Sequence, residues 1–125
     1  MKILFTLESS AGMEVKVKQI KGGVTAAKGF KAASTAAGIK YKDRTDMAMI
    51  YSEVPCAVAG TFTTNIVKAA PVKWDQHVVY DSKKAQAVIV NAGIANACTG
   101  EEGMGYCKAT AEKVNKLLQI PTDEV

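Results

Sequence analysis

An apolar run over residues 85–90, "AQAVIV", leads directly into an uncharged turn, "VNAGIANACTG" over residues 90–100, and this succession constrains the fold more than any other part of the chain. A short apolar run bounded by a turn predicts a buried strand, here a central one covered on both faces. Ligands of α/β sheets bind beside the loops that follow the carboxyl ends of strands. The sequence therefore predicts a strand near residues 85–91 and places the candidate site in the turn after it.

The turn offers neutral hydrogen-bonding groups among small residues. Asn91, Asn96 and Thr99 can donate or accept hydrogen bonds. Gly93 and Gly100 let a ligand approach the backbone closely. The same side chains could instead serve only the unpaired backbone groups of the turn. Composition favours neither interpretation, so a ligand-binding loop and a purely structural loop remain equal alternatives.

The rest of the chain alternates strand-like and helix-like patterns, which indicates the α/β class. Helical spacing predicts helices near residues 71–80 and 104–119. Pro55 is expected to separate two strands. The strands are predicted near residues 15–20, 29–37, 47–54, 57–63 and 85–91. The second helix is expected to bury the side formed by Tyr106, Ala109, Thr110, Val114, Leu117 and Leu118.

Length and composition indicate one globular domain. A chain of 125 residues buries roughly two-thirds of its unfolded surface and needs no metal or disulfide support. The net charge of +4 is spread along the sequence without a basic patch interleaved with aromatic residues, so nucleic acid is not an expected partner. No apolar run approaches the ~20 residues that a membrane span needs. We therefore expect a cytoplasmic protein with no membrane partner.

The first residues form a segment of their own. "MKILFTLESSAG" contains an apolar run too short for a secretory signal, which needs ~7–15 apolar residues, and Met13 follows it as a second methionine. Residues 1–12 are therefore interpreted as a leader or an artefact of cloning or of the start site, although they could equally add a strand. The domain proper is expected to comprise residues 13–125.

Several catalytic and metal sites are excluded by missing motifs. The sequence has no GxGxxG, GxSxG or HExxH. Cys56, Cys98 and Cys107 lack CxxC spacing and have a single histidine to join them, so neither structural zinc nor a disulfide framework is expected. Cys98 and Cys107 are interpreted as packing residues. That histidine, His77, is interpreted as a structural or surface residue, because the local sequence shows no partner to orient a catalytic base.

Three blocks carry a specific resemblance. They are "GGVTAAKGFKAASTAAGIK" from Gly22, "TFTTNIVKAAPV" from Thr61 and "VIVNAGIANACTGEEG" from Val88. In this order they resemble the N-terminal blocks of the bifunctional ornithine acetyltransferase / glutamate N-acetyltransferase family of arginine biosynthesis. The resemblance extends from Gly22 to about Gln119 and therefore covers most of the chain.

The resemblance implies an enzyme that moves an acetyl group from N-acetylornithine to glutamate, in some members also from acetyl-CoA. It implies a layered α/β sandwich, no cofactor and an oligomer. In this family a precursor cleaves itself before a threonine, which then acts as nucleophile with its own α-amine as base. A Ser-Thr-Gly turn stabilises the oxyanion. Asn91, Asn96 and Thr99 are then expected to belong to the substrate-pocket wall.

The sequence lacks the oxyanion turn and the cleavage site of the family pattern. It contains no Ser-Thr-Gly, and its one Ala-Thr pair, at Ala109, lies inside a predicted helix. No catalytic residue is therefore assigned. Residues 13–125 are interpreted as the N-terminal portion of the alpha chain, truncated before the oxyanion turn and the cleavage site and inactive alone. The remainder of the alpha chain and the beta chain are its expected partners. The alternative is a free-standing small α/β binding or interaction domain without catalysis.

Overall fold

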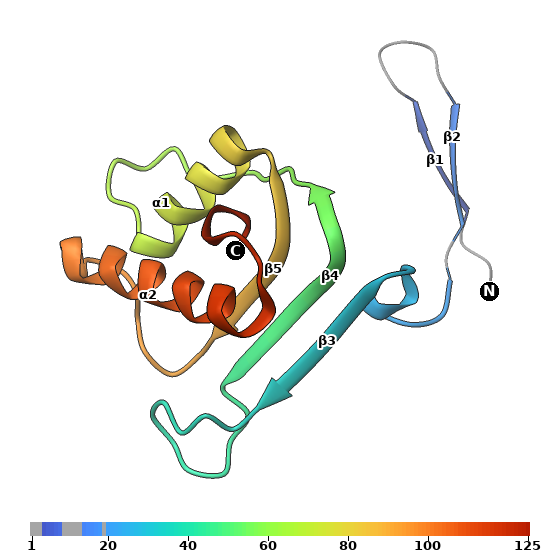
Figure 1. Cartoon of the computed structure of the whole chain (residues 1–125). Coiled ribbons are helices and arrows are strands. Elements are labelled where there is room, and N and C mark those ends of the chain that lie inside the picture. Colours follow the sequence, from blue (N-terminus) through green and yellow to red (C-terminus); the bar gives the residue numbers. More distant parts are fainter. Residues whose placement is uncertain (1–3, 9–13, 19) are drawn as a thin grey trace.

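The computed structural model describes residues 4–8, 14–18 and 20–125 (Figure 1). It contains a three-stranded antiparallel sheet in the order β3-β4-β5 and a separate antiparallel pair, β1-β2. The helices and strands together confirm the predicted α/β class. The strands are β1 (Leu4–Glu8), β2 (Glu14–Lys18), β3 (Phe30–Thr35), β4 (Met47–Ala57) and β5 (Lys84–Asn91). The helices are α1 (Ala70–His77) and α2 (Gly100–Leu118), with 3-10 turns at Val24–Ala26 and Thr122–Glu124.

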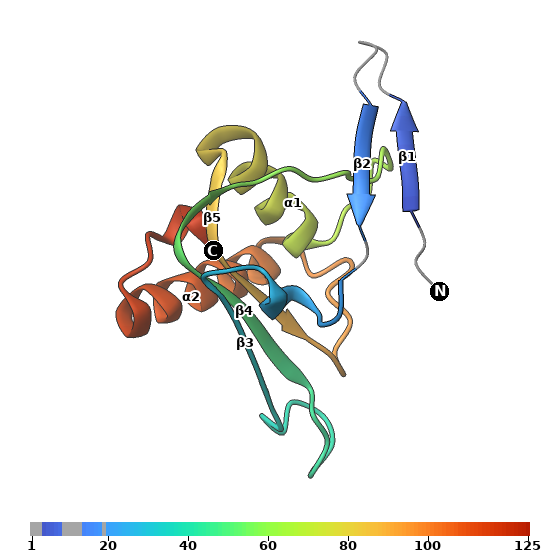
Figure 2. The ribbon, with the colours of Figure 1, turned by 90° about the vertical axis from the view of Figure 1, so that its right-hand side faces the viewer.

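Both helices lie on one face of the β3-β4-β5 sheet (Figures 1 and 2). Ala87 of β5, Val114 of α2 and Ile120 form the buried centre, and the half-buried Tyr51 and Ile89 pack against them. Ile120 is 1% exposed, and burial of a side chain of this size contributes about 1.5–3 kcal/mol. The core therefore joins α2 and the segment after it to β4 and β5.

Strand β5 has the predicted bounds but not the predicted surroundings. Within the described part of the chain it pairs with β4 alone and forms an edge of the sheet. Ala87 and Ile89 pack into the core, whereas Val88 and Val90 are each 51% exposed. The prediction of a central strand covered on both faces is wrong here, because an apolar run does not reveal which neighbours cover it.

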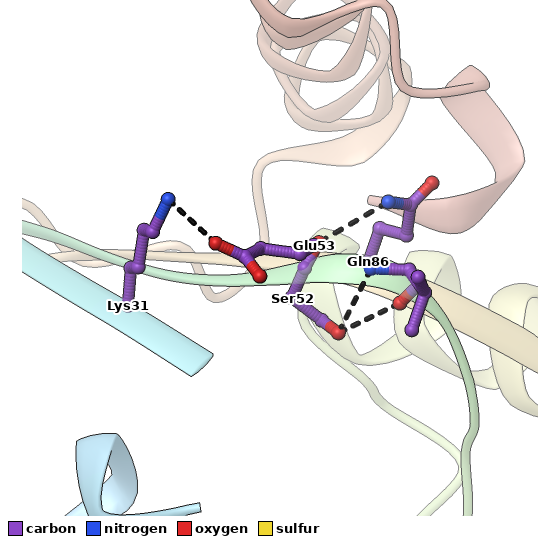
Figure 3. Close-up of polar contacts among 5 residues, drawn as sticks. Lys31, Ser52, Glu53 and Gln86 are labelled. Carbon is purple, nitrogen blue, oxygen red and sulfur yellow. Dashed lines mark hydrogen bonds and ion pairs between the residues drawn. The ribbon is translucent and has the colours of Figure 1, made fainter. Parts of the chain in front are cut away.

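Strand β4 passes through Pro55 instead of ending before it. Its register against β5 shifts between residues 51 and 56, which marks a β-bulge. The buried Ser52 hydroxyl donates a hydrogen bond to the Val54 carbonyl at 2.7 Å, and Gln86 Nε2 donates to the Ser52 carbonyl at 3.1 Å (Figure 3). Because proline has no N–H to donate, it is tolerated at such a bulge.

The predicted strand over residues 57–63 is wrong, and so is the separation of two strands at Pro55. Strand β4 continues to Ala57, and residues 58–69 contain neither helix nor strand. The segment instead leads from the sheet to the start of α1 (Figure 1). The residues at the bulge extend β4 to Ala57. The apolar residues after Ala57 therefore lie in a loop, where they pack against the helices instead of forming a strand.

Helix α2 begins at Gly100 rather than near residue 104, and of the side predicted to be buried only Val114 is buried. Its buried residues are Gly103, Ala111 and Val114. Tyr106 and Leu117 are 62% and 69% exposed, so the prediction that they belong to the buried side is wrong. Because small residues form most of the buried face of α2, a prediction based on its large apolar side chains gives the wrong face as the buried one.

Gly103 lies where α2 packs closely against the start of α1. A Cβ at Gly103 would overlap the side chain of Thr99 and lie 3.0 Å from the Cβ of Ala70, the first residue of α1. Helices approach this closely only where side chains are minimal. Helix α1 itself begins as predicted and continues into a π turn over Val78–Ser82.

From the sequence, residues 1–12 are interpreted as a leader or an artefact, with an added strand as the alternative. Leu4–Glu8 pairs with Glu14–Lys18 as β1-β2, so part of the interval 1–12 forms a strand. Residues 1–3, 9–13 and 19 lie outside the described residues. The interpretation of residues 1–12 as a leader, and of 13–125 as the domain proper, therefore stays a prediction.

Candidate site in the turn after strand β5

The turn between β5 and α2 brings together the three predicted site residues without placing them in one hollow. Asn91 is exposed at the end of β5, and Asn96 and Thr99 are half-buried. Thr99 Oγ1 donates a hydrogen bond to the Asn96 carbonyl at 3.2 Å. Gly93 has a φ of +101°, in the left-handed region that favours glycine. The Thr99 side chain therefore stabilises the turn itself, as expected if the loop is purely structural.

A cavity of about 410 Å³, here called the sheet–helix cavity, lies between the sheet and the two helices. Asn91 and Asn96 line it at the turn. Its remaining wall is mostly apolar and comes from every element packed on this face of the sheet. Contributors include Phe62 of the loop, Trp74 and Asp75 of α1, Ile89 of β5, and Gly103, Cys107 and Ala111 of α2.

A second cavity of about 390 Å³, here called the loop cavity, lies between the segment before α1 and the turn. Thr99 lines this cavity and not the sheet–helix cavity. Lys68 and Lys73 contribute positive charge to it, and Cys98 and Gly100 complete the side of the turn. The predicted trio is thus divided, with two asparagines on one hollow and the threonine on the other.

Two titratable groups in the wall of the sheet–helix cavity are perturbed by their surroundings. Burial raises the pKa of the Asp75 carboxyl above its ordinary value. Burial, followed by the nearby charge of Asp75, raises the pKa of the Cys107 thiol. Both shifts favour the neutral form. Cys107 therefore behaves as a packing thiol, in agreement with its interpretation from the sequence. Cys98 is exposed, so the same interpretation is wrong for it.

His77 has a partner that the sequence interpretation missed. Its Nδ1 lies 2.6 Å from Asp81 Oδ2, one helical turn further along the chain. The expectation that the local sequence offers no orienting partner is therefore wrong. Both side chains are exposed, however, and neither lines the sheet–helix cavity or the loop cavity. The position of His77 is that of a surface residue.

Residues 4–8, 14–18 and 20–125 contain neither a cluster of metal-binding side chains nor a membrane-spanning helix. In these residues no group of three or more His, Cys, Asp and Glu side chains is arranged to hold a metal ion. No helix in the same part of the chain is long and apolar enough to cross a membrane. Cys56, Cys98 and Cys107, all within it, are free thiols.

Asp46 is the residue near the site that sequence reasoning missed most clearly. It is 8% exposed, and its backbone carbonyl accepts a hydrogen bond from Ala92 N–H in the turn at 2.9 Å. Its carboxylate accepts two more from the loop before β4. The available signal was an aspartate placed between a glycine-containing loop and an apolar strand, a position where its side chain often satisfies backbone N–H groups.

Fold and site together define the class of this protein. It is an α/β protein in which helices cover one face of an antiparallel sheet and enclose a largely apolar cavity with convergent polar groups at its edge. Such cavities are the usual sites of small-molecule binding. The sequence model of the ArgJ family matches residues 31–125, and the chain belongs to this family.

Similar curated proteins are bifunctional proteins of arginine biosynthesis. The chain is 49% identical over 109 residues to the chloroplastic ArgJ protein of Zea mays, and this match covers 86% of the chain and 24% of the relative. It is 48% identical over 106 residues to the ArgJ protein of Gloeobacter violaceus, covering 85% of the chain and 26% of the relative. The chain thus spans about a quarter of the length of these relatives.

Solved structures agree on the fold. The arginine biosynthesis bifunctional protein of Bacillus halodurans has a TM-score of 0.78 at 36% identity, over 99% of this chain and 58% of that one. The ornithine acetyltransferase of Mycobacterium tuberculosis, solved with ornithine, has a TM-score of 0.77 at 48% identity, over 82% and 56%. These likenesses confirm the expected fold of the ornithine acetyltransferase type.

Proposed function

We propose that the chain is part of an acetyltransferase that moves an acetyl group from N-acetylornithine to glutamate in arginine biosynthesis. The observation that carries this proposal is the 48% identity, over 82% of the chain, to an ornithine acetyltransferase whose structure contains ornithine. Identity at this level over an ordered set of blocks supports a shared reaction as well as a shared fold. The substrates are small amino-acid derivatives, which fit a cavity of about 410 Å³.

The proposed reaction passes through an acetyl-threonine. A threonine exposed by self-cleavage attacks the acetyl carbonyl of N-acetylornithine, and its own α-amine takes the hydroxyl proton. Ornithine leaves with its amine protonated, and the amine of glutamate then attacks the acetyl-threonine. A Ser-Thr-Gly turn would stabilise each tetrahedral oxyanion. Because the present sequence contains no Ser-Thr-Gly, this machinery is assigned to the remainder of the alpha chain and to the beta chain.

Within this reaction the present chain supplies part of the pocket. Asn91 and Asn96, which line the sheet–helix cavity, are the proposed substrate-pocket wall. Thr99, the third proposed pocket residue, lines the adjoining loop cavity and is linked to Asn96 by its hydrogen bond to the Asn96 carbonyl. Neutral amides suit the acetamide and amine groups of the substrates, since they can both donate and accept. No cofactor is needed, and acetyl-CoA would enter only as a second acetyl donor.

The proposal is tested by expressing the complete reading frame that contains this sequence. Intact-mass spectrometry should give two chains whose masses sum to the translated precursor, the second beginning with threonine. Incubation with N-acetylornithine and glutamate should then release ornithine and N-acetylglutamate. The 125-residue chain, assayed alone as the control, should release neither. A single uncut chain without transfer would favour a small α/β binding domain instead.

Substrate contact by the turn has its own test in the complete enzyme. Asn96→Ala should raise KM or lower kcat for acetyl transfer about tenfold, the usual scale for one lost substrate hydrogen bond. Unchanged kinetics with a lower melting temperature would instead assign Asn96 to the structural alternative. The size of the complete enzyme, by sedimentation velocity, tests the expected oligomer, and cell fractionation tests the expected cytoplasmic location.

A further inference from the structure

Asp46 forms a junction between two segments that are far apart in the sequence. Its carboxylate accepts hydrogen bonds from Ala37 N–H at Oδ1 and from Ile39 N–H at Oδ2, each at 2.7 Å. Its own N–H donates to the Thr35 carbonyl at 3.2 Å, and its carbonyl accepts from Ala92 N–H at 2.9 Å. One buried residue thus holds the loop over residues 36–45 on one side and the turn after β5 on the other.

The sheet alone does not require these contacts. The ladder between β3 and β4 ends at the pair Thr35 and Met47, and the ladder between β4 and β5 ends at Met47 and Asn91. Asp46 lies one residue beyond both ladders. Its carboxylate therefore serves the loop rather than the strand pairing, and its carbonyl extends the contact with β5 into the turn.

The loop also packs directly against the turn. A Cβ added to Gly93 would lie 3.1 Å from Lys40 Cβ and 3.9 Å from Lys40 N. A side chain at position 93 would therefore press against Lys40, and the glycine is what lets the loop and the turn lie this close together. Ala92 and Gly93, the two turn residues that touch Asp46 and the loop, lie between Asn91 and Asn96, which line the sheet–helix cavity.

We propose that Asp46 is a positioning residue for acetyl transfer, holding the loop over residues 36–45 against the turn and so fixing Asn91 and Asn96 in the cavity wall. This inference rests on the proposed function. The role requires a carboxylate, because both Oδ atoms accept from backbone N–H groups. An asparagine would set an N–H against one of these donors, and it would lose the strength that charge gives to such bonds.

Asp46→Asn in the complete enzyme tests the role, with Asp43→Asn as the matched control. Asp43 is exposed in the same loop, and its left-handed φ of 56° is one that asparagine tolerates. Hydrogen exchange should accelerate in D46N in peptides covering residues 36–40 and also in those covering 91–96. The value of kcat/KM for acetyl transfer should fall about tenfold or more, mainly through KM. D43N should match the wild type in both measurements.

Gly93→Ala tests the same contact from the side of the turn and keeps the test decisive if D46N does not fold. It should accelerate exchange in residues 36–40, which it does not alter. Because the left-handed φ of Gly93 also strains an alanine within the turn itself, the exchange in the loop, and not the kinetics of this variant, tests the contact. Faster exchange confined to residues 36–40 in D46N would overturn the link to the turn. A disturbed turn with wild-type kinetics would overturn the role in catalysis. Absence of transfer by the wild type would refute the proposed function itself, and the exchange data would still decide whether Asp46 positions the turn.

Discussion

The indole nitrogen of Trp74 donates a hydrogen bond to the backbone oxygen of Val125, 51 positions further along the chain, at 2.7 Å. Val125 also packs against the core cluster that contains Ile120. Helix α1 is thereby joined to the segment that follows α2, beside the sheet–helix cavity that both residues line. Because this bond fixes two segments that are distant in sequence, its loss should lower the stability of the whole fold by a measurable amount.

Trp74→Phe should lower the free energy of unfolding by about 1–2 kcal/mol, because the N–H donor and part of the ring volume are lost. Urea unfolding followed by circular dichroism measures the change, since the variant lacks the single tryptophan. Lys73→Gln, an exposed change on the same helix, is the control and should stay within about 0.5 kcal/mol of the wild type. Equal stabilities for the two variants would show that the bond contributes nothing.

Ser52→Ala should destabilise the fold by about 1–2 kcal/mol, because the bulge would keep its irregular backbone without the hydroxyl that bonds to it. Ser52 is 3% exposed, and its Oγ donates to the Val54 carbonyl and also lies 3.1 Å from Cys56 Sγ. Ser34→Ala makes the same chemical change at an exposed position of β3 and should be nearly neutral. Thermal melting of both variants measures the difference, and an unchanged melting temperature for Ser52→Ala would show that the hydroxyl does not stabilise the bulge.

The bulge also shows where prediction from sequence stopped. Apolar runs predicted the positions of β4 and β5 closely, because a strand buried on one side needs a regular supply of apolar side chains. The position of β3 followed instead from the glycines that disfavour a helix there. Pro55 was expected to end a strand, since proline cannot donate to a ladder. Whether a proline ends a strand or occupies a bulge depends on distant partners such as Gln86, which bonds to Ser52 from 34 positions away, and the local pattern carries no information about them.

The position of the candidate site was predictable from the sequence, but the contacts that hold it in place were not. The turn after β5 follows from an apolar run, small residues and two asparagines, and the cavity lies beside it. The local sequence offered a signal for the Asp46 side chain, but not for the contacts of Asp46 with Ala92 and of Gly103 with Ala70, because these form across the fold. The exposed face of β5 at Val88 was likewise hidden, since burial depends on neighbours in space.

The stability of the chain should depend on pH through Asp75. Burial raises the pKa of its carboxyl above the ordinary value of 3.8 in the folded state. A carboxyl with a raised folded pKa stabilises the fold below the unfolded value, and this contribution is lost as the pH rises through the folded value. Asp75→Asn should therefore gain melting temperature relative to the wild type as the pH increases from about 3 to 6. Calorimetry on Asp75→Asn and on the control Asp43→Asn, a position that does not line the sheet–helix cavity, measures this, and an offset for Asp75→Asn that does not change with pH would contradict the assignment.

Cys107 should react with thiol reagents more slowly than Cys98. Burial raises the pKa of the Cys107 thiol, and the Asp75 charge raises it further, so little thiolate forms near neutral pH. Cys98 is exposed and accessible to the same reagent. Because the charge of Asp75 is one of the causes, Asp75→Asn should accelerate labelling of Cys107 and leave Cys98 unchanged, as peptide mass spectrometry at about pH 8 would record. If Asp75→Asn accelerated both thiols equally, the change would reflect general loosening of the fold, and the electrostatic link between Asp75 and Cys107 would be rejected.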